Sequence, residues 1–275
     1  MRLVRVWVGL VLFSFASAAV ADVFFDVPIV TQVQGVAFYR TSLAVSNVGP
    51  FSVMGLNFVY RSPVDNTMQS SHRQDSVDHF GTFASDDIVE FMKTNSNMRA
   101  VDKTAALFGT LQLELVSTVD PADITIVART YSPGAGGNGT LGIAYAGRPN
   151  AAGTRAFTRA TTTVRNGTFG HDGNTRANVG IINWGNSAID LKVEYIDPST
   201  GLSLKTFNVS SAAGHLLESR EVVQFGNVFG DAALTGVSRI IVIVTPIPPS
   251  QTFSGYAVQL DNTTNDGSFF LMTEK

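Results

Sequence analysis

The residues best suited to chemistry are two histidines with acidic neighbours in a polar stretch of the first half of the sequence. In order, they are His72, Arg73, Asp75, Asp78 and His79. Histidine and aspartate are common zinc ligands. The spacing of the two histidines, however, brings them to one point neither on a helix nor on a strand. We therefore interpret the stretch as a solvated polar loop and predict neither a metal site nor a cofactor.

The histidines of the second half offer little for catalysis. His171 stands beside Asp172 in a glycine-rich stretch, and His215 lies far along the chain. A serine hydrolase presents its nucleophile on a sharp turn such as G-x-S-x-G, and the sequence has no such motif. We predict no catalytic residues and a protein that is not an enzyme.

Two glycine-containing motifs favour turns over ligand sites. Asp261–Gly267, DNTTNDG, departs from the calcium-loop pattern at Thr263 and at its late glycine, and a hairpin turn explains it better. Gly134–Gly139 lacks the Lys-Ser/Thr of a phosphate loop and precedes an expected strand rather than a helix.

The composition is that of a folded globular protein rather than a disordered chain or a coiled coil. The chain has 275 residues, long enough for one large domain or two ordinary ones. It is 44% hydrophobic and only 15% charged, which is too apolar for disorder and too poor in charge for a coiled coil. The absence of cysteine excludes disulfides, thiol catalysis and thiolate metal sites.

The first 21 residues resemble a signal peptide. Arg2 and Arg5 precede the apolar run Trp7–Phe15, and Ala19-Val20-Ala21 supplies a cleavage pattern. The alternative is an uncleaved anchor, but the run is short for a bilayer span of about 20 residues. We predict an exported protein, extracellular or periplasmic, whose mature chain does not span a membrane. Its formal net charge of −3, more negative after cleavage, argues against nucleic-acid binding.

Short alternating segments predict an all-β fold. Phe38–Asn47 places Thr41, Leu43 and Val45 on one face, and Leu56, Phe58 and Tyr60 alternate in the next strand. In Leu107–Val116, the leucines at 111, 113 and 115 face inward, and Gln112 and Glu114 face outward. Further expected strands are Val23–Gln32, with an edge position or bulge at Pro28, Val77–Phe83, Asp87–Met92 and Ile124–Tyr131. Asp65–Ser76 is expected to be a loop, and Gly147–Ala156 a linker.

The order of these features recurs in the second half. Thr41–Pro63 is answered by Thr175–Pro198, and we interpret each as a hairpin that begins a unit. Seven or so short strands per unit are typical of an immunoglobulin-like sandwich. We therefore predict two tandem immunoglobulin-like antiparallel β-sandwich domains after the signal peptide. The predicted bounds are 1–21 for the signal peptide, 22–147 for the first domain, 148–156 for the linker and 157–275 for the second domain.

Matched polar positions are the candidate site residues. They are Arg40, Asn47 and Gly49 in the first copy and Arg176, Asn183 and Gly185 in the second. On strand parity Asn47 points inward, and a buried amide needs partners, so we predict a structural role in the adjoining turn. A ligand site repeated in each domain is the alternative. Trp184, whose counterpart in the first copy is Val48, remains the candidate contact residue for a ligand in this repeated stretch.

The chain resembles tandem immunoglobulin-like repeat proteins exported by bacteria, as found in acidobacteria-like genomes. The resemblance covers nearly all of the mature chain and rests on the order of several short motifs. They are Arg40-Thr41-Ser42-Leu43 with Asn47, Arg176-Ala177-Asn178-Val179-Gly180 with Asn183, Arg129-Thr130-Tyr131 with Gly139-Thr140-Leu141-Gly142, and Asp261–Asp266. Ala177 departs from the Thr expected there. The resemblance implies an exported, non-enzymatic repeat pair.

Three functions fit these expectations. The first is an exported structural or protein-interaction module with an unknown protein or cell-surface partner. The second is a chaperone-like or pilus-assembly protein that lends an edge strand, with Leu111–Leu115 or Ile240–Val244 as candidate strands. The third is a carbohydrate-binding module, whose aromatic platform would need Trp184, Tyr131 or Tyr256 to be exposed.

Overall fold

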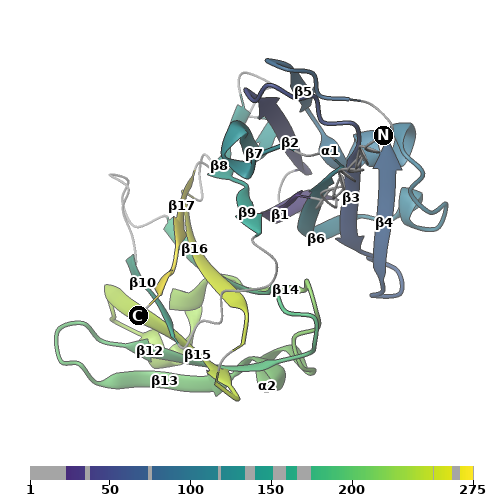
Figure 1. The fold of residues 1–275 in the computed structure, drawn as a ribbon. Helices are drawn as coiled ribbons and strands as arrows, with labels where there is room; N and C mark the ends of the chain where they lie inside the picture. Colours follow the sequence, from purple (N-terminus) through teal and green to yellow (C-terminus); the bar gives the residue numbers. More distant parts are fainter. Residues whose placement is uncertain are drawn as a thin grey trace, which may run out of the picture.

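A computed structural model describes most of the chain after residue 22 (Figure 1). The described residues are 23–34, 38–73, 76–116, 119–133, 140–150, 159–165, 175–249, 251–261 and 267–274. The expected signal peptide, the glycine-rich loop at 134–139 and His171-Asp172 lie outside them. We call the described residues up to 150 the first half and those from 159 the second half. Among the described residues, no helix combines the length and the apolarity that a bilayer span requires.

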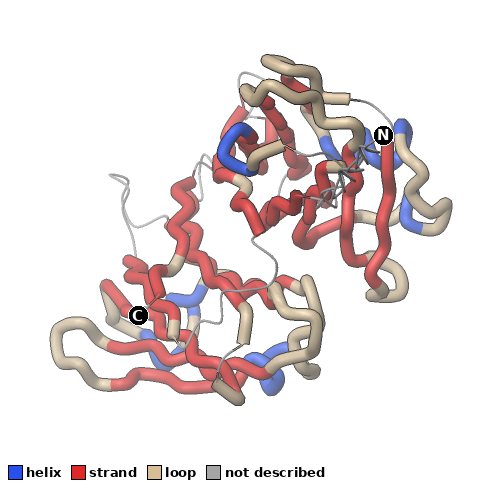
Figure 2. Tube along the Cα trace, in the orientation of Figure 1, coloured by secondary structure: helices blue, strands red, loops and turns tan. Residues whose placement is uncertain are grey.

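The structure is all-β with antiparallel sheets, as the alternating segments predict. Figure 2 shows that strands make up most of both halves and that the helices are short. The first half contains β1 (Val23–Gln34), β2 (Phe38–Asn47), β3 (Leu56–Arg61), β4 (Met68–Arg73), β5 (Thr82–Ser85), α1 (Ile88–Asn95), η1 (Asp102–Thr104), β6 (Leu107–Leu115), η2 (Pro121–Asp123), β7 (Ile124–Pro133), β8 (Thr140–Ala146) and β9 (Arg148–Asn150).

The second half contains a second series of strands. They are β10 (Ala160–Arg165), β11 (Thr175–Asn183), β12 (Asp190–Ile196), β13 (Ser203–Asn208), β14 (Val222–Phe225), β15 (Arg239–Ile247), β16 (Phe253–Asp261), β17 (Gly267–Leu271) and β18 (Thr273–Glu274). Between them lie the helical turns α2 (Val209–Ala213), η4 (Val228–Gly230) and η5 (Ala232–Leu234).

The strands pair in the same order in the two halves. In the second half, one sheet runs β13-β12-β15-β10-β18 and the other β14-β11-β16-β17. In the first half, β4-β3-β6-β1 with β9 beside β1 matches the first order, and β5-β2-β7-β8 matches the second. The first half differs in that the end of β1 also pairs with β2, which joins all nine strands into one sheet.

Apolar side chains on the inner faces form two clusters. Leu43, Val45, Phe58 and Leu113 are typical of the first cluster, and Leu191, Val193 and Val244 of the second. Strands such as β2, β3 and β12 therefore bury one face, in the way that a two-layer β structure requires. Ile182, Trp184, Tyr256 and Val258 of the second half belong to the first cluster, so apolar contact continues from one half into the other.

Several strand predictions agree with the structure. β2 begins and ends where the alternation predicted, and its inward side chains are buried. The register of β1 against β6 shifts between Val27 and Val30, which accommodates the proline at position 28 in a bulge. Gln112 lies on the face opposite Leu111 and Leu113, as predicted, but this position is buried, and its amide donates to the Asp26 carboxylate (2.8 Å) on the neighbouring strand.

Other predictions are wrong. The expected loop at 65–76 contains β4, whose polar residues satisfy the sheet edge beside β3. The expected strand at 87–92 is α1: Asp87 caps the helix by accepting from the Glu90 amide (3.0 Å), and Ile88, Val89 and Met92 form its buried face. The expected linker begins with β9, which pairs with β1.

The expected hairpins are also wrong. β11 and β12 belong to different sheets, and β2 and β3 do not pair with each other. The second-half unit therefore carries the chain from one sheet to the other, and the first-half unit carries it between the matching parts of the single first-half sheet.

Candidate functional site

The repeated asparagines hold the segment that crosses between sheets. Asn47 and Asn183 are fully buried at the ends of β2 and β11. The Asn47 amide donates to the Phe51 carbonyl (2.8 Å), and its side-chain oxygen accepts from the Gly49 amide (3.0 Å). Asn183 makes the same two bonds with Ser187 and Gly185, each 2.8 Å long.

Each asparagine also reaches a second loop. Asn47 donates to the Val77 carbonyl (3.1 Å), and Asn183 donates to the Leu217 carbonyl (2.9 Å). Buried amides with these bonds fasten two loops to each other at one end of each half. We call this end, with its two loops, the loop end of that half. It comprises residues 47–55 and 76–81 in the first half, and 183–189 and 215–221 in the second.

The repeated arginines occupy one ladder position but have different cross-strand neighbours. Arg40 lies opposite Tyr131, and its guanidinium is 4.9 Å from the centre of the tyrosine ring. Arg176 lies opposite Leu260. The first-half arginine therefore lies over the ring of its ladder partner, whereas the ladder partner of the second-half arginine is aliphatic.

Trp184 is a contact between the halves rather than an exposed platform. Its side chain is only 9% exposed, its Nε1 donates to Ser254 Oγ (2.8 Å), and it packs in the apolar cluster of the first half. Tyr131 and Tyr256 are buried as well. The three aromatic residues considered for a carbohydrate platform therefore do not form one.

The loop end of the second half lies on the outer face of a first-half sheet. Thr110 Oγ1 donates to the Arg220 carbonyl (2.7 Å), and Arg61 Nη2 donates to the Ser219 carbonyl. The Arg220 guanidinium lies 5.8 Å from the Trp184 ring, with one nitrogen 3.7 Å from an Asp26 oxygen. Burial lowers the pKa of Arg220, and Asp26 partly opposes that change.

The loop end of the first half has the same backbone but a different surface. The backbone N–H of Asn47 donates to the Gly81 carbonyl, and the backbone N–H of Asn183 donates to the Glu221 carbonyl, each at 3.0 Å. Phe80 therefore occupies the position of Arg220. Both have positive φ, +54° and +60°, a conformation rare for a bulky side chain.

Apolar side chains cover this first-half loop end. Val48, Phe51, Met54 and Phe80 are 56%, 60%, 67% and 74% exposed. The loops that carry them are joined by the Val53–Val77 bridge and by the contact of His79 Nδ1 with the Gly49 carbonyl. We call these four residues the apolar loop end.

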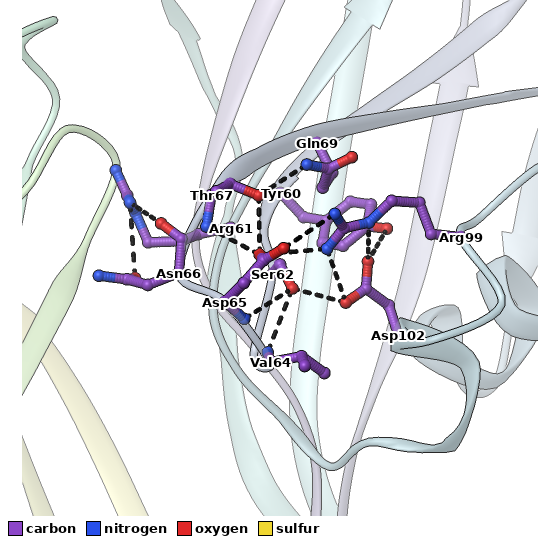
Figure 3. A network of polar contacts seen from close by, with 10 residues as sticks. All are labelled: Tyr60, Arg61, Ser62, Val64, Asp65, Asn66, Thr67, Gln69, Arg99 and Asp102. Carbon is purple, nitrogen blue, oxygen red and sulfur yellow. Dashed lines mark hydrogen bonds and ion pairs between the residues drawn. The ribbon is translucent and has the colours of Figure 1, made fainter.

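A buried polar network stabilises the opposite end of β3 (Figure 3). Asp102 is fully buried and accepts from Tyr60 Oη (3.0 Å), Ser62 Oγ (2.6 Å) and Arg99 Nε (2.8 Å). Burial alone would raise the pKa of Asp102, but the bonds from Arg99, Ser62 and Tyr60 outweigh it, so the pKa is lowered. Arg99 also pairs with Asp65 (3.0 Å).

The second half has an open cleft in place of this closed network. Its volume is about 680 Å³, and it lies between β13 and β14. Tyr195, Phe207 and Phe225 form an edge-to-face row along it, with centroids 5.6 and 5.2 Å apart, and Lys205 pairs with Asp231 at its margin. In the first half, α1 fills the equivalent space, with Phe91 packed edge-on against Phe58 and Phe83.

The described histidines that the sequence offered as candidate ligands or catalytic residues do not lie together in the structure. The His72 ring contacts Asn97, whereas the His79 ring stacks beside Phe80. His215 pairs with Glu221 (2.8 Å). Within the described ranges, no three histidine or acidic side chains gather as a metal site would require. Leu111–Leu115 and Ile240–Val244 lie in central strands paired on both sides, so neither is an edge strand available for lending.

The apolar loop end could not be found from the sequence. The repeat pairs Val48 with Trp184, and extending that pairing along the chain at the same offset places Phe80 against Leu216 rather than Arg220. The missing signal was structural, because only the backbone bonds of the two asparagines fix the second loop in register.

No protein-family model matches the sequence, and no curated protein matches it significantly. The resemblance to exported repeat proteins therefore stays a prediction, and the geometry carries the functional proposal.

Proposed function

We propose that this protein is an exported, non-enzymatic protein-interaction module made of two tandem immunoglobulin-like sandwich domains. The matching strand order of the two halves supports the tandem arrangement. Residues 1–21 support export to an extracellular or periplasmic location. The buried carboxylate of Asp102 serves a closed hydrogen-bond network, which supports a structural role for the most enclosed acidic group of the first half.

The apolar loop end is the observation that carries the proposal. Exposed apolar side chains grouped on one surface are typical of protein-binding sites. Phe80 is the most exposed of them, and its positive φ, shared with Arg220, is a conformation in which a bulky side chain is rare. The equivalent loop end of the second half already makes a protein contact, with the outer face of a first-half sheet.

Photo-cross-linking from the loop end tests this proposal. A photoreactive amino acid would replace Phe80 or Phe51 in cells that naturally produce the protein. The control position is Leu202, which is also exposed and apolar but lies in the β12–β13 turn. We expect discrete protein adducts from positions 80 and 51 and none from 202. Equal labelling from all three positions, or no adduct at all, would contradict the proposal.

The cleft of the second half supports carbohydrate binding as a second candidate function. Phe207 and Phe225 line it together with Gln224, Asn227 and Asp231, a combination of aromatic and hydrogen-bonding groups suited to a sugar. A glycan array would test this function, with Phe225→Ala as the variant that should lose any signal. Array binding unchanged in that variant would exclude the cleft.

A further inference from the structure

We propose that copies of this protein associate head to tail, with the apolar loop end of one copy docked on an isoleucine face of the next. This face comprises Ile196 of β12 and Ile241 and Ile243 of β15, on the outer side of their sheet. The inference rests on the proposed function, because it names the partner of the same loop end.

The contact between the two halves supplies the template. There, Ser219 and Arg220 of the second-half loop end lie on the outer face of the first-half sheet, against Arg61, Thr110 and Asp26. The chain therefore already shows that this loop end and this sheet face fit together. Each half has one of each. Among the described residues, the first-half loop end and the second-half sheet face therefore remain without such a contact.

The strand registers identify the residues of the free face. Tyr60 lies opposite Leu111, and Tyr195 lies opposite Val242. This alignment places Ile196 at the position of Arg61. By the same register, Ile241 takes the position of Thr110, and Ile243 takes that of Gln112. Asp26, which lies opposite Gln112, is replaced by Thr161, which lies opposite Ile243.

Three positions of the sheet face change from polar to isoleucine, and the loop end changes from Arg220 to Phe80. Glu194, opposite Ile243, changes the other way, since it takes the position of Val59 and pairs with Lys192 on the same face. Within the chain, the polar Arg220 meets polar and charged partners; between copies, Phe80 in its place would meet isoleucines.

Ile196 and Ile241 are half-buried and offer apolar surface. Ile243 is buried between Glu194 of β12 and Thr161 of β10. These differences also disfavour docking of the second-half loop end on the isoleucine face, because Arg220 would then lose its contact with the Asp26 carboxylate.

The contact between copies is weaker than the contact within the chain. Ile182, Tyr256 and Val258 strengthen the internal contact. The positions equivalent to Ile182 and Val258 hold Ser46 and Arg129 in the first half. The contact between copies also lacks the benefit of covalent linkage. We expect a dissociation constant between about 10 µM and 1 mM.

Sedimentation of purified protein tests the inference, with the protein produced by export so that residues 1–21 are processed normally. The wild type should show a mass that rises with concentration. Phe80→Arg and Ile241→Thr, each carrying the residue of the other half, should remain monomeric with unchanged thermal unfolding. Leu202→Thr, at an exposed site outside both surfaces, should behave like the wild type.

Mixing the two variants tests the head-to-tail geometry. Phe80→Arg retains an intact isoleucine face and Ile241→Thr an intact loop end, so an equimolar mixture should form dimers and stop there. A mixture that stays monomeric, or a wild type that is monomeric at about 1 mM, would overturn the inference. If the wild type is monomeric but position 80 still cross-links to another protein in cells, self-association fails and the proposed function stands.

Discussion

β2 and β11 occupy the same place in the two halves, yet their outer faces have different surroundings. The outward residues Ser42, Ala44 and Ser46 of β2 are half-buried. The corresponding Asn178, Gly180 and Ile182 of β11 are buried, as part of the surface near the first half. One strand order thus supports an open face in one half and a covered face in the other, and the difference resides in a few side chains.

The connections between the two sheets differ in the same way. From residue 86 to residue 106, the first half places α1 and the Asp102 network across the space between β4 and β5. From residue 226 to residue 238, the second half has only η4 and η5, and the cleft stays open beside Lys205 and Asp231. In the first half, the space beside the sheet is filled and the loop end exposes apolar side chains. In the second half, that space is an open cleft and the loop end is covered.

The largest expected effect comes from Asp102→Ala. It leaves Tyr60, Ser62 and Arg99 without their buried acceptor, and unfolding by urea should show a loss of about 3–5 kcal/mol. The matched variant Asp231→Ala breaks a partly exposed pair and should lose about 1 kcal/mol or less. Because the folded pKa of Asp102 is lowered, its contribution is present above the unfolded pKa and is lost as the pH falls into the acid range. Equal losses in the two variants would remove the contrast between closed and open connections.

Gly180→Ala tests the covered face of β11. A Cβ at this position would lie 1.9 Å from the Tyr256 ring, so we expect destabilisation by about 2–3 kcal/mol. Gly109→Ala, whose Cβ would meet no atom within 4 Å, is the control. Denaturant midpoints would measure both. If the two variants lose the same stability, Tyr256 does not pack as described.

Asn47→Ala and Asn183→Ala test what the halves share. Each removes an amide that satisfies buried backbone groups, and each should cost about 2 kcal/mol in chemical unfolding. Asn97→Ala, which removes an exposed amide, is the control. A large loss in one half and none in the other would show that the loop ends are held differently.

The smallest expected effect is a pH dependence at the loop end of the second half. The Glu221 carboxylate, which accepts a hydrogen bond from the His215 ring, raises the pKa of His215. The stabilisation from the His215–Glu221 pair is therefore fully present below the pKa of histidine in the unfolded chain, about 6.5. It is lost as the pH rises through the higher pKa of His215 in the folded protein. Because the pair is half-exposed, we expect no more than about 0.5 kcal/mol between wild type and His215→Asn. A difference that grows with rising pH would contradict the assignment.

Sequence reasoning predicted the strands with a clear alternation of inward and outward residues. Phe38–Asn47 and Leu56–Arg61 alternate clearly, and this period placed the strands but not their partners. β4 was missed because its sequence, MQSSHR, is polar on both faces, and α1 was missed because its apolar run is short. The crossing between sheets at Asn47 and Asn183 reads like a hairpin locally, since only tertiary pairing separates the two strands.

The candidate site was only partly predictable for the same reason. The inward direction of Asn47 followed from strand parity, and the structure shows its amide bonded to the adjoining turn. Trp184 is buried because it packs against the first half. The contacts between the halves join residues more than 100 positions apart in the sequence, such as Thr110 and Arg220. Phe80 is exposed because, among the described residues, no sheet face packs on its loop end. The sequence around Phe80 cannot indicate this.

Hydroxyl-radical footprinting of the dilute, monomeric protein tests the central contrast most directly. Oxidation rates of Phe51, Met54, Phe80, Trp184 and Tyr256 would each be normalised to the same residue in the denatured protein. The structure predicts rapid oxidation of Phe51, Met54 and Phe80 and strong protection of Trp184 and Tyr256. Protection of Phe80 together with rapid oxidation of Trp184 would show that the exposed and covered loop ends have been assigned to the wrong halves.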